Sequence, residues 1–161
     1  MWLKKYCLDG GYSLGIYGSG WPDGLSKGQT MYDFEAGCKI YRGAKIAIGD
    51  SQWPESGFVS NRIFQILAAG NCVLCHQWFK GIEELGLADS ENCFIWRDAS
   101  ELEWILDGFL QQQEKLDLLS RRGEELALTK HSFDSRLNEL WKMLEIKGRE
   151  AELEVSDGWR W

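Results

Sequence analysis

Residues 60–75 read SNRIFQILAAGNCVLC, which predicts a short helix that ends at Gly70 and leads into a buried strand. Ser60, Asn61 and Arg62 open this stretch and fall on the first turns of the predicted helix. A helix N-terminus collects unpaired N–H groups and the positive end of the helix dipole, so these three residues are suited to hold an anion such as a phosphate. Nucleotide binding is therefore the first functional hypothesis.

The composition favours one globular, soluble domain. The chain has 161 residues, 44% of them hydrophobic, and a formal net charge of −7. Nucleic acids and anionic membranes bind nonspecifically to basic faces, so this charge argues against both partners, and any phosphate site must be local. The sequence contains neither a run long enough for a membrane span nor the apolar core of a signal peptide, which predicts a cytoplasmic protein.

The five cysteines are an odd number without the spacing of a disulfide framework. Cys72, Cys75 and Cys93 lie in apolar, strand-like runs, where a thiol behaves as a small hydrophobic group, so we expect reduced structural cysteines. Cys72 and Cys75 form a C-x-x-C pair. Residues three apart on a strand point to opposite faces, and no second pair completes a zinc site, so we expect no bound metal.

Predicted strands alternate with predicted helices along the chain. This order implies an α/β fold: a doubly wound, Rossmann-like, mostly parallel sheet flanked by helices. We assign residues 1–146 to this domain and residues 147–161 to an acidic tail that contains two tryptophans. The predicted strands are 12–17, 45–49, 72–75 and 92–96, and the predicted helices are 1–9, 31–44, 59–69, 81–85, 113–130, 132–146 and one that starts at Asp98 and includes Leu102, Ile105, Leu106 and Phe109.

Ligands of such sheets bind beyond the carboxyl ends of the strands, which here are the loops after Tyr17, Gly49, Cys75 and Trp96. Gly18 is interpreted either as a turn or as a ligand contact. His76 follows a buried strand and is either a phosphate or sugar contact or a structural histidine. His131 precedes a helix, and we expect it to position that helix's N-terminus.

The sequence has nine tryptophans. Trp21 and Trp53 lie in loops at the predicted ligand edge, where packing is favoured over stacking on a base or sugar. Trp96, Trp104 and Trp141 are predicted to lie in the core.

Several segments, taken in order, resemble the C-terminal, nucleotide-sugar-binding half of a GT-B glycosyltransferase. The branch most similar to this chain is the group-1, spore-maturation-like one, and the resemblance covers nearly all of residues 2–144. Ser60-x-Arg62-x-Phe64-Gln65-x-Leu67-Ala68-Ala69-Gly70 is similar to that family's S-x-R-x-F-E-x-L-A-x-G signature. The other similar segments are 12–21, 41–48, 79–85 and His131-Ser132-Phe133-x-x-Arg136.

The resemblance implies a nucleoside diphosphate sugar as the donor substrate, bound without a metal or another cofactor. It places Ser60 and Arg62 against the phosphates and the Gly81–Ile82 backbone against the phosphate or sugar. Gln65 stands where the family has a ribose-binding glutamate, and an amide lacks that residue's charge and one of its acceptor oxygens. The donor-binding residues expected on this basis are Gly18, Trp21, Ser60, Asn61, Arg62, Gln65, His76, Gly81 and Ile82.

The resemblance also implies a C-terminal half that lacks its N-terminal domain. The family's catalytic cleft lies between two domains, so we expect the chain alone to be inactive. Its partners would be a nucleotide sugar and either the missing N-terminal domain or a second copy that pairs with the open sheet edge. The alternative is a noncatalytic binding or assembly module that retains the fold. A flavodoxin-like or receiver domain is a third reading, supported weakly by Asp50 alone.

Overall fold

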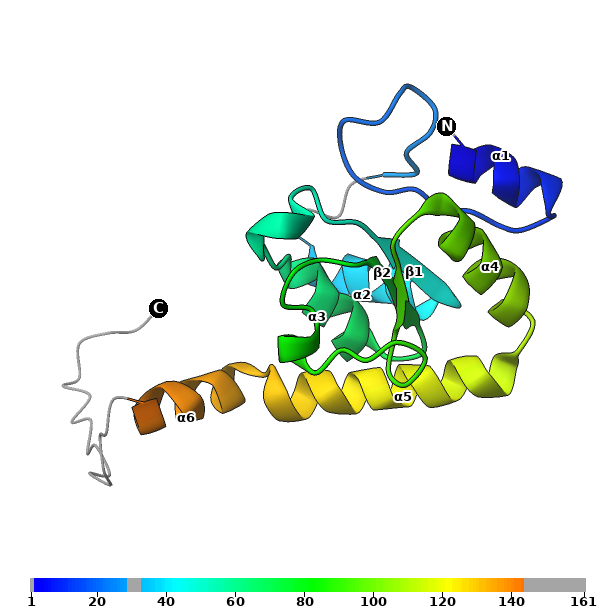
Figure 1. The fold of residues 1–161 in the computed structure, drawn as a ribbon. Helices are drawn as coiled ribbons and strands as arrows, with labels where there is room; N and C mark the ends of the chain where they lie inside the picture. Colours follow the sequence, from blue (N-terminus) through cyan, green and yellow to red (C-terminus); the bar gives the residue numbers. More distant parts are fainter. Residues whose placement is uncertain (1, 29–32, 144–161) are drawn as a thin grey trace.

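The computed structural model describes residues 2–28 and 33–143 (Figure 1). Its centre is a parallel sheet of three strands in the order β1-β2-β3, formed by β1 (Ile46–Gly49), β2 (Val73–Gln77) and β3 (Phe94–Trp96). Cys75 at the middle of β2 lies opposite Ile48 on one side and Phe94 on the other. The predicted α/β class is confirmed, and three of the four predicted strands form.

Residues 2–28 and 33–143 form six α-helices and two short 3-10 helices in addition to the sheet. Asp98 caps the helix after β3 by accepting hydrogen bonds from the backbone N–H groups of Ser100 and Glu101, so the predicted start is confirmed. The α-helices are α1 (Trp2–Asp9), α2 (Phe34–Arg42), α3 (Asn61–Ala69), α4 (Ala99–Phe109), α5 (Gln113–Lys130) and α6 (Phe133–Met143), and the 3-10 helices are η1 (Pro54–Ser56) and η2 (Glu83–Leu85).

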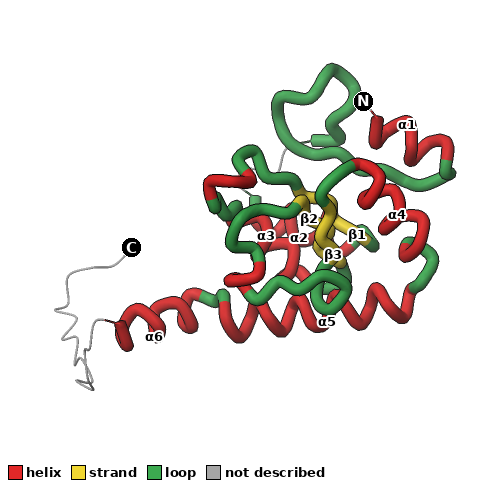
Figure 2. Tube along the Cα trace, in the orientation of Figure 1, coloured by secondary structure: helices red, strands yellow, loops and turns green. Residues whose placement is uncertain are grey.

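Helices cover both faces of the sheet, which makes the fold doubly wound (Figure 2). On one face Ile63, Ile66 and Leu67 of α3 pack with Leu74 of β2, while Tyr41 from α2 packs against this cluster. On the other face Leu102, Ile105 and Leu106 of α4 pack with Val73 and Cys75, and Leu3 and Tyr6 of α1 lie against them. Residues of α5 contribute to both clusters, because this helix runs along the edge of the sheet from which the strands start (Figure 1).

The cysteines lie as the sequence predicted. Cys72, Cys75 and Cys93 are buried and all five thiols are free. Cys72 and Cys75 belong to the clusters on opposite faces of the sheet, because side chains alternate along a strand. Burial raises the pKa of Cys72 to about 12 and that of Cys93 to about 12. These thiols therefore stay protonated at neutral pH and act as apolar core groups.

The strand predicted for residues 12–17 does not form. These residues alternate between exposed and half-buried, as in a strand, but no described residue forms a ladder with them. Their recorded backbone bonds go elsewhere: Tyr12 N–H donates to Cys7 O at 2.7 Å and Lys27 N–H donates to Ile16 O at 2.8 Å. A sheet strand needs a neighbouring strand for its hydrogen bonds, and alternation in the sequence does not supply one.

The core placement of the tryptophans was partly wrong. Trp96 is half-buried against the cluster that contains α4, but Trp104 is 66% exposed and Trp141 is 49% exposed. The buried residues of α4 are Leu102, Ile105 and Leu106, and Trp104 points away from this stripe because two residues along a helix turn the side chain by about 200°. It packs instead edge-on against Phe109.

The helix boundaries agree with the prediction to within a few residues. Helix α2 begins at Phe34 because Asp33 accepts a hydrogen bond from Ala36 N–H, and part of its predicted first turn, residues 31 and 32, lies outside the described residues. The helix predicted for 81–85 is a 3-10 turn over its last three residues. The last residues of the predicted helix 132–146, and the predicted tail 147–161, also lie outside the described residues.

Candidate functional site

The opening turn of α3 lies beside the carboxyl ends of β1 and β2. Ser60 is the N-cap residue of α3, and its hydroxyl accepts a hydrogen bond from Arg62 N–H at 3.3 Å. Asn61 and Arg62 are exposed on the first turn, while Gln65 one turn later is half-buried. Ser60 therefore uses its hydroxyl to fix the start of the helix, and the two residues after it present an amide and a guanidinium to solvent.

His76 lies at the end of β2 and is 4% exposed. Its Nδ1 is 2.7 Å from Gln77 O, and its ring lies edge-on to that of Phe79 with 5.4 Å between centroids. A carbonyl oxygen only accepts, so Nδ1 carries the proton and Nε2 is an acceptor. In this tautomer Nε2 of His76 can accept a hydrogen bond from a hydroxyl group, whereas a fully ionised phosphate has no proton to donate to it.

The charge of Arg62 acts on two neighbouring groups. The pKa of His76 is below its ordinary value, first because the ring is buried; the Gln77 carbonyl and Asp50 raise it and Arg62 lowers it further. The pKa of Tyr41 is raised by burial, and Arg62 opposes this rise. The positive charge of Arg62 thus lowers the pKa of both Tyr41 on α2 and His76 on β2, although the Arg62 side chain is exposed.

Gly81 and Ile82 follow β2 in a tight turn. Gly81 has φ +87, a conformation that other residues adopt only with strain. Ile82 is fully buried, and its N–H donates to Phe79 O at 3.2 Å. A Cβ on Gly81 would lie 3.8 Å from the Glu84 carboxylate. The turn therefore brings an acidic group close to the backbone that was expected to face the donor, and the Ile82 N–H already has a partner.

Gly18 and Trp21 belong to the loop that follows α1, and this loop lies at the end of the sheet where α4 begins (Figure 1). The loop closes on itself: Gly18 N–H donates to Gly28 O at 2.9 Å, and the Ser26 hydroxyl donates to Gly18 O at 2.9 Å. Both backbone groups of Gly18 are therefore used within the loop. Trp21 is 46% exposed and lines a cavity of about 350 Å³, whose lining residues among those described all belong to this loop.

The second loop tryptophan, Trp53, is 56% exposed and lies edge-on to Phe58 at 6.0 Å between ring centroids. The packing expected for Trp21 and Trp53 is thus partial, since each keeps about half of its surface in contact with solvent.

Gly49, Ser51 and Gln77 were not predicted from the sequence as site residues. Gly49 lies directly opposite His76 in the β1–β2 register. Ser51 N–H donates to Gln77 Oε1 at 3.3 Å. The Ser51 hydroxyl and the Trp96 indole N–H at the end of β3 are buried and have no hydrogen-bond partner among the described residues. The sequence predicted the loops that follow these strands. The residues that contact one another there depend on how the strands pair, which the sequence pattern does not specify.

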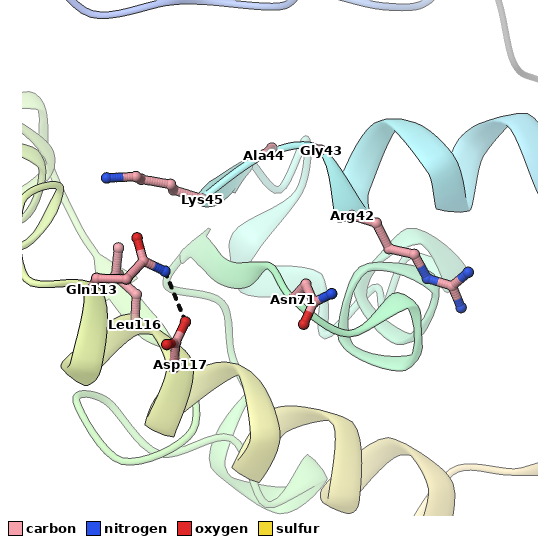
Figure 3. A pocket seen from close by; sticks show the side chains of 8 residues that line it. All are labelled: Arg42, Gly43, Ala44, Lys45, Asn71, Gln113, Leu116 and Asp117. Carbon is pink, nitrogen blue, oxygen red and sulfur yellow. Dashed lines mark hydrogen bonds between the residues drawn. The ribbon is translucent and has the colours of Figure 1, made fainter.

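A second cavity lies at the opposite edge of the sheet, where the strands start (Figure 3). Its volume is about 270 Å³, and three of its side chains already have hydrogen-bond partners: Arg42 Nε donates to Ala69 O at 2.7 Å, Lys45 Nζ donates to Leu110 O at 2.9 Å, and Gln113 Nε2 donates to Asp117 Oδ1 at 2.8 Å. The lining residues are Arg42, Gly43, Ala44, Lys45, Asn71, Gln113, Leu116 and Asp117.

The two edges therefore differ chemically. The carboxyl edge has an exposed guanidinium at a helix N-terminus, a neutral imidazole, and a hydroxyl and an indole N–H that lack partners within the described part of the chain. Together these groups suit a ligand with both a phosphate and hydroxyls. No group of three or more His, Cys, Asp or Glu side chains that could hold a metal ion is found among residues 2–28 and 33–143. Within the same residues, no helix combines the length and apolarity of a membrane span.

A family model described as glycosyl transferase-like matches residues 2–142, which include every described strand and nearly all of the described helices. Neither the curated proteins nor the solved structures gave a match.

Proposed function

The chain belongs to the glycosyl transferase-like family, and on that premise we propose that it is the donor-binding, C-terminal domain of a GT-B glycosyltransferase. The donor is a nucleoside diphosphate sugar. The proposal includes a place in the group-1, spore-maturation-like branch and a cytoplasmic location. The observation that carries it is the position of Arg62: an exposed guanidinium on the first turn of α3, at the carboxyl edge of a parallel sheet that also carries the buried His76.

The diphosphate would lie against the start of α3. A guanidinium offers two parallel N–H donors to phosphate oxygens, and the helix N-terminus adds backbone N–H groups and a favourable dipole. These interactions stabilise the diphosphate as a leaving group without a bound metal. Asn61 supplies an amide beside Arg62. The Ser60 hydroxyl caps the start of α3 and thereby fixes the backbone position of both residues.

The hydroxyls of the donor would lie near β2. Nε2 of His76 accepts, so a sugar or ribose hydroxyl is its best partner, and the Gln65 amide can accept one more. Because Gln65 lacks the charge of a glutamate, we expect weaker ribose binding than a glutamate would give. Gly18, Trp21, Gly81 and Ile82 remain proposed donor contacts on the family resemblance alone, because the Ile82 N–H and both backbone groups of Gly18 already have partners.

The chain alone would bind the donor without transferring the sugar. Nothing in the described residues pairs a nucleophile or base with an acceptor site, and the proposal assigns the acceptor to a separate N-terminal domain. An alternative function is a noncatalytic binding module. The observations that favour it are the amide at Gln65 and the Gly18 N–H and carbonyl, both of which are used inside their own loop.

Isothermal titration calorimetry with UDP, GDP and their sugars tests the proposal. We expect binding of one base series, with loss of about tenfold or more in affinity for Arg62→Ala, because a charge-assisted hydrogen bond contributes about 1.5–3 kcal/mol. Arg121→Ala is the matched control, since Arg121 is exposed on α5 and its Nε bonds only to Asp117 O among the described residues. No heat with any nucleotide at millimolar concentration, or equal loss for both variants, refutes donor binding.

A further inference from the structure

Two exposed aromatic side chains lie in the loop that joins β1 to α3. Trp53 is 56% exposed and Phe58 is 53% exposed, and their rings lie edge-on, with 6.0 Å between centroids and an interplanar angle of 89°. Each side chain therefore keeps about half of its surface in water although the two rings contact each other. We call this pair the aromatic platform.

Hydrogen bonds within the loop hold the platform in place. The Trp53 carbonyl accepts a hydrogen bond from Ser56 N–H at 3.1 Å and another from the Ser56 hydroxyl at 2.8 Å, and the same hydroxyl accepts one from Phe58 N–H at 3.2 Å. Gly57 turns the chain between them with φ +70, a conformation that glycine adopts without strain. The backbone of both aromatic residues is thus fixed by Ser56, and a preformed contact surface loses less entropy when a ligand binds.

The loop is attached to both elements that carry proposed donor contacts. Lys80 N–H donates to Pro54 O at 2.8 Å, which joins the loop to the turn that follows β2. At the other end of the loop, Phe58 and Val59 directly precede Ser60, the N-cap residue of α3, and Val59 packs against the core. The platform is therefore held at the carboxyl edge of the sheet, next to the start of α3.

Exposure alone does not distinguish Trp53 from other tryptophans. Trp104 on α4 is 66% exposed and lies edge-on to Phe109 with 5.7 Å between ring centroids, but α4 covers the face of the sheet opposite α3. The loop that carries Trp53 instead leads directly into α3, whose first turn bears the exposed guanidinium of Arg62. This combination suits a ligand that has both an anionic group and a ring with an apolar face.

We propose that the aromatic platform stacks on the sugar ring of the donor. The inference rests on the proposed function, because it adds a sugar subsite beside the diphosphate at α3. The negative face of an aromatic ring attracts the weakly positive C–H groups on one side of a sugar, and the contact removes apolar surface from water. The sugar is favoured over the base because the loop is bonded to Lys80, next to the Gly81 turn, whereas the ribose is assigned to Gln65.

Calorimetry that compares UDP and GDP with their sugars isolates this contact. We expect Trp53→Ala to bind the nucleotide sugar about tenfold more weakly than the wild type does and to bind the free nucleoside diphosphate equally well. Trp53→Tyr keeps an aromatic face and should retain most of the affinity, and Trp104→Ala is the matched control, which should bind as the wild type does. Equal loss for the sugar and the free diphosphate, or no loss for either, overturns the sugar subsite and leaves the Arg62 test of donor binding unaffected.

If no nucleotide gives heat, donor binding is refuted, and NMR of the indole N–H groups then tests the platform alone. The Trp53 signal is assigned from its absence in Trp53→Phe, and the methyl glycosides of glucose, galactose and mannose are added at high millimolar concentration. We expect the Trp53 signal to shift while the Trp104 signal stays in place, which would support a sugar platform without a nucleotide site. A Trp53 signal that none of the glycosides shifts overturns the platform.

Discussion

Gly49 and His76 lie opposite each other at the carboxyl ends of β1 and β2, and the histidine ring occupies the space that a side chain on Gly49 would need. A Cβ at Gly49 would lie 2.5 Å from His76 Cδ2 and 3.1 Å from Nε2. The His76 ring is also held by Gln77 O and by Phe79. Because Gly49 has no side chain at the end of β1, the imidazole of His76 can be buried beside it in β2.

Gly49→Ala should destabilise the domain, because the ring of His76 must move out of a packed position. Inserting an extra methyl group into a packed site costs about 1–3 kcal/mol, and we expect a loss in that range from urea denaturation. Gly37→Ala is the control: nothing lies within 4 Å of its added Cβ, and alanine favours a helix. A Gly49→Ala protein as stable as the wild type would contradict this packing.

Gly123→Ala should also destabilise the protein, although alanine is favoured in a helix by about 1 kcal/mol. Its Cβ would lie 2.8 Å from Leu67 Cδ2 and 2.9 Å from the backbone oxygen of Asn92, and a backbone atom cannot easily move aside. We expect the cost of about 1–3 kcal/mol for overpacking to exceed the gain in propensity. In Gly108→Ala nothing lies within 4 Å of the added Cβ, so only the gain in helix propensity should remain. Thermal unfolding should therefore give a lower midpoint temperature for Gly123→Ala than for Gly108→Ala.

The two histidines make stability fall below neutral pH. The pKa values of His76 and His131 are both lowered in the folded protein, so between the ordinary value of 6.5 and the folded values the unfolded chain binds more protons. Their contribution to stability is complete above pH 6.5 and decreases as the pH falls through this window. Urea denaturation should therefore give a smaller free energy of unfolding at about pH 5.5 than at about pH 7.5. Equal or greater stability at the lower pH would contradict it.

The thiols should differ in reactivity. Cys38 on α2 is half-buried, whereas Cys7, Cys72, Cys75 and Cys93 are buried and have raised pKa values because of burial. The thiolate is the reactive form, so in the native protein we expect one thiol to react quickly with a disulfide reagent and the other four only on unfolding. Cys38→Ser should remove the fast phase. A fast phase that persists in this variant would show that a core thiol is accessible.

The sequence predicted most elements of the fold, and the site at the carboxyl edge of the sheet stays a prediction. Alternation of helices and apolar runs was sufficient for β1, β2 and β3, and caps such as Asp98 located helix starts. The segment 12–17 has the alternation of a strand but no ladder partner, because pairing depends on a neighbour that a local pattern does not specify.

Individual contacts within the site were less predictable. Arg62 was identified from its place on a helix, whereas the pairing of Gly49 with His76 depends on strand register, and the bond between His131 Nε2 and Leu85 O joins residues 46 positions apart. The use of the Ile82 N–H within its own turn likewise follows from backbone geometry that residue type does not reveal.

NMR titration of the labelled protein with the nucleoside diphosphate sugar that gives heat in calorimetry tests the central claim most directly, because it shows which edge of the sheet binds. We predict that the largest amide shifts fall on residues 60–65, 76 and 77, and 81 and 82, and that Arg62→Ala abolishes them at the same ligand concentration. Shifts confined to the cavity at Arg42, Lys45, Asn71 and Gln113, or no shifts at all, would contradict a donor site at the carboxyl edge.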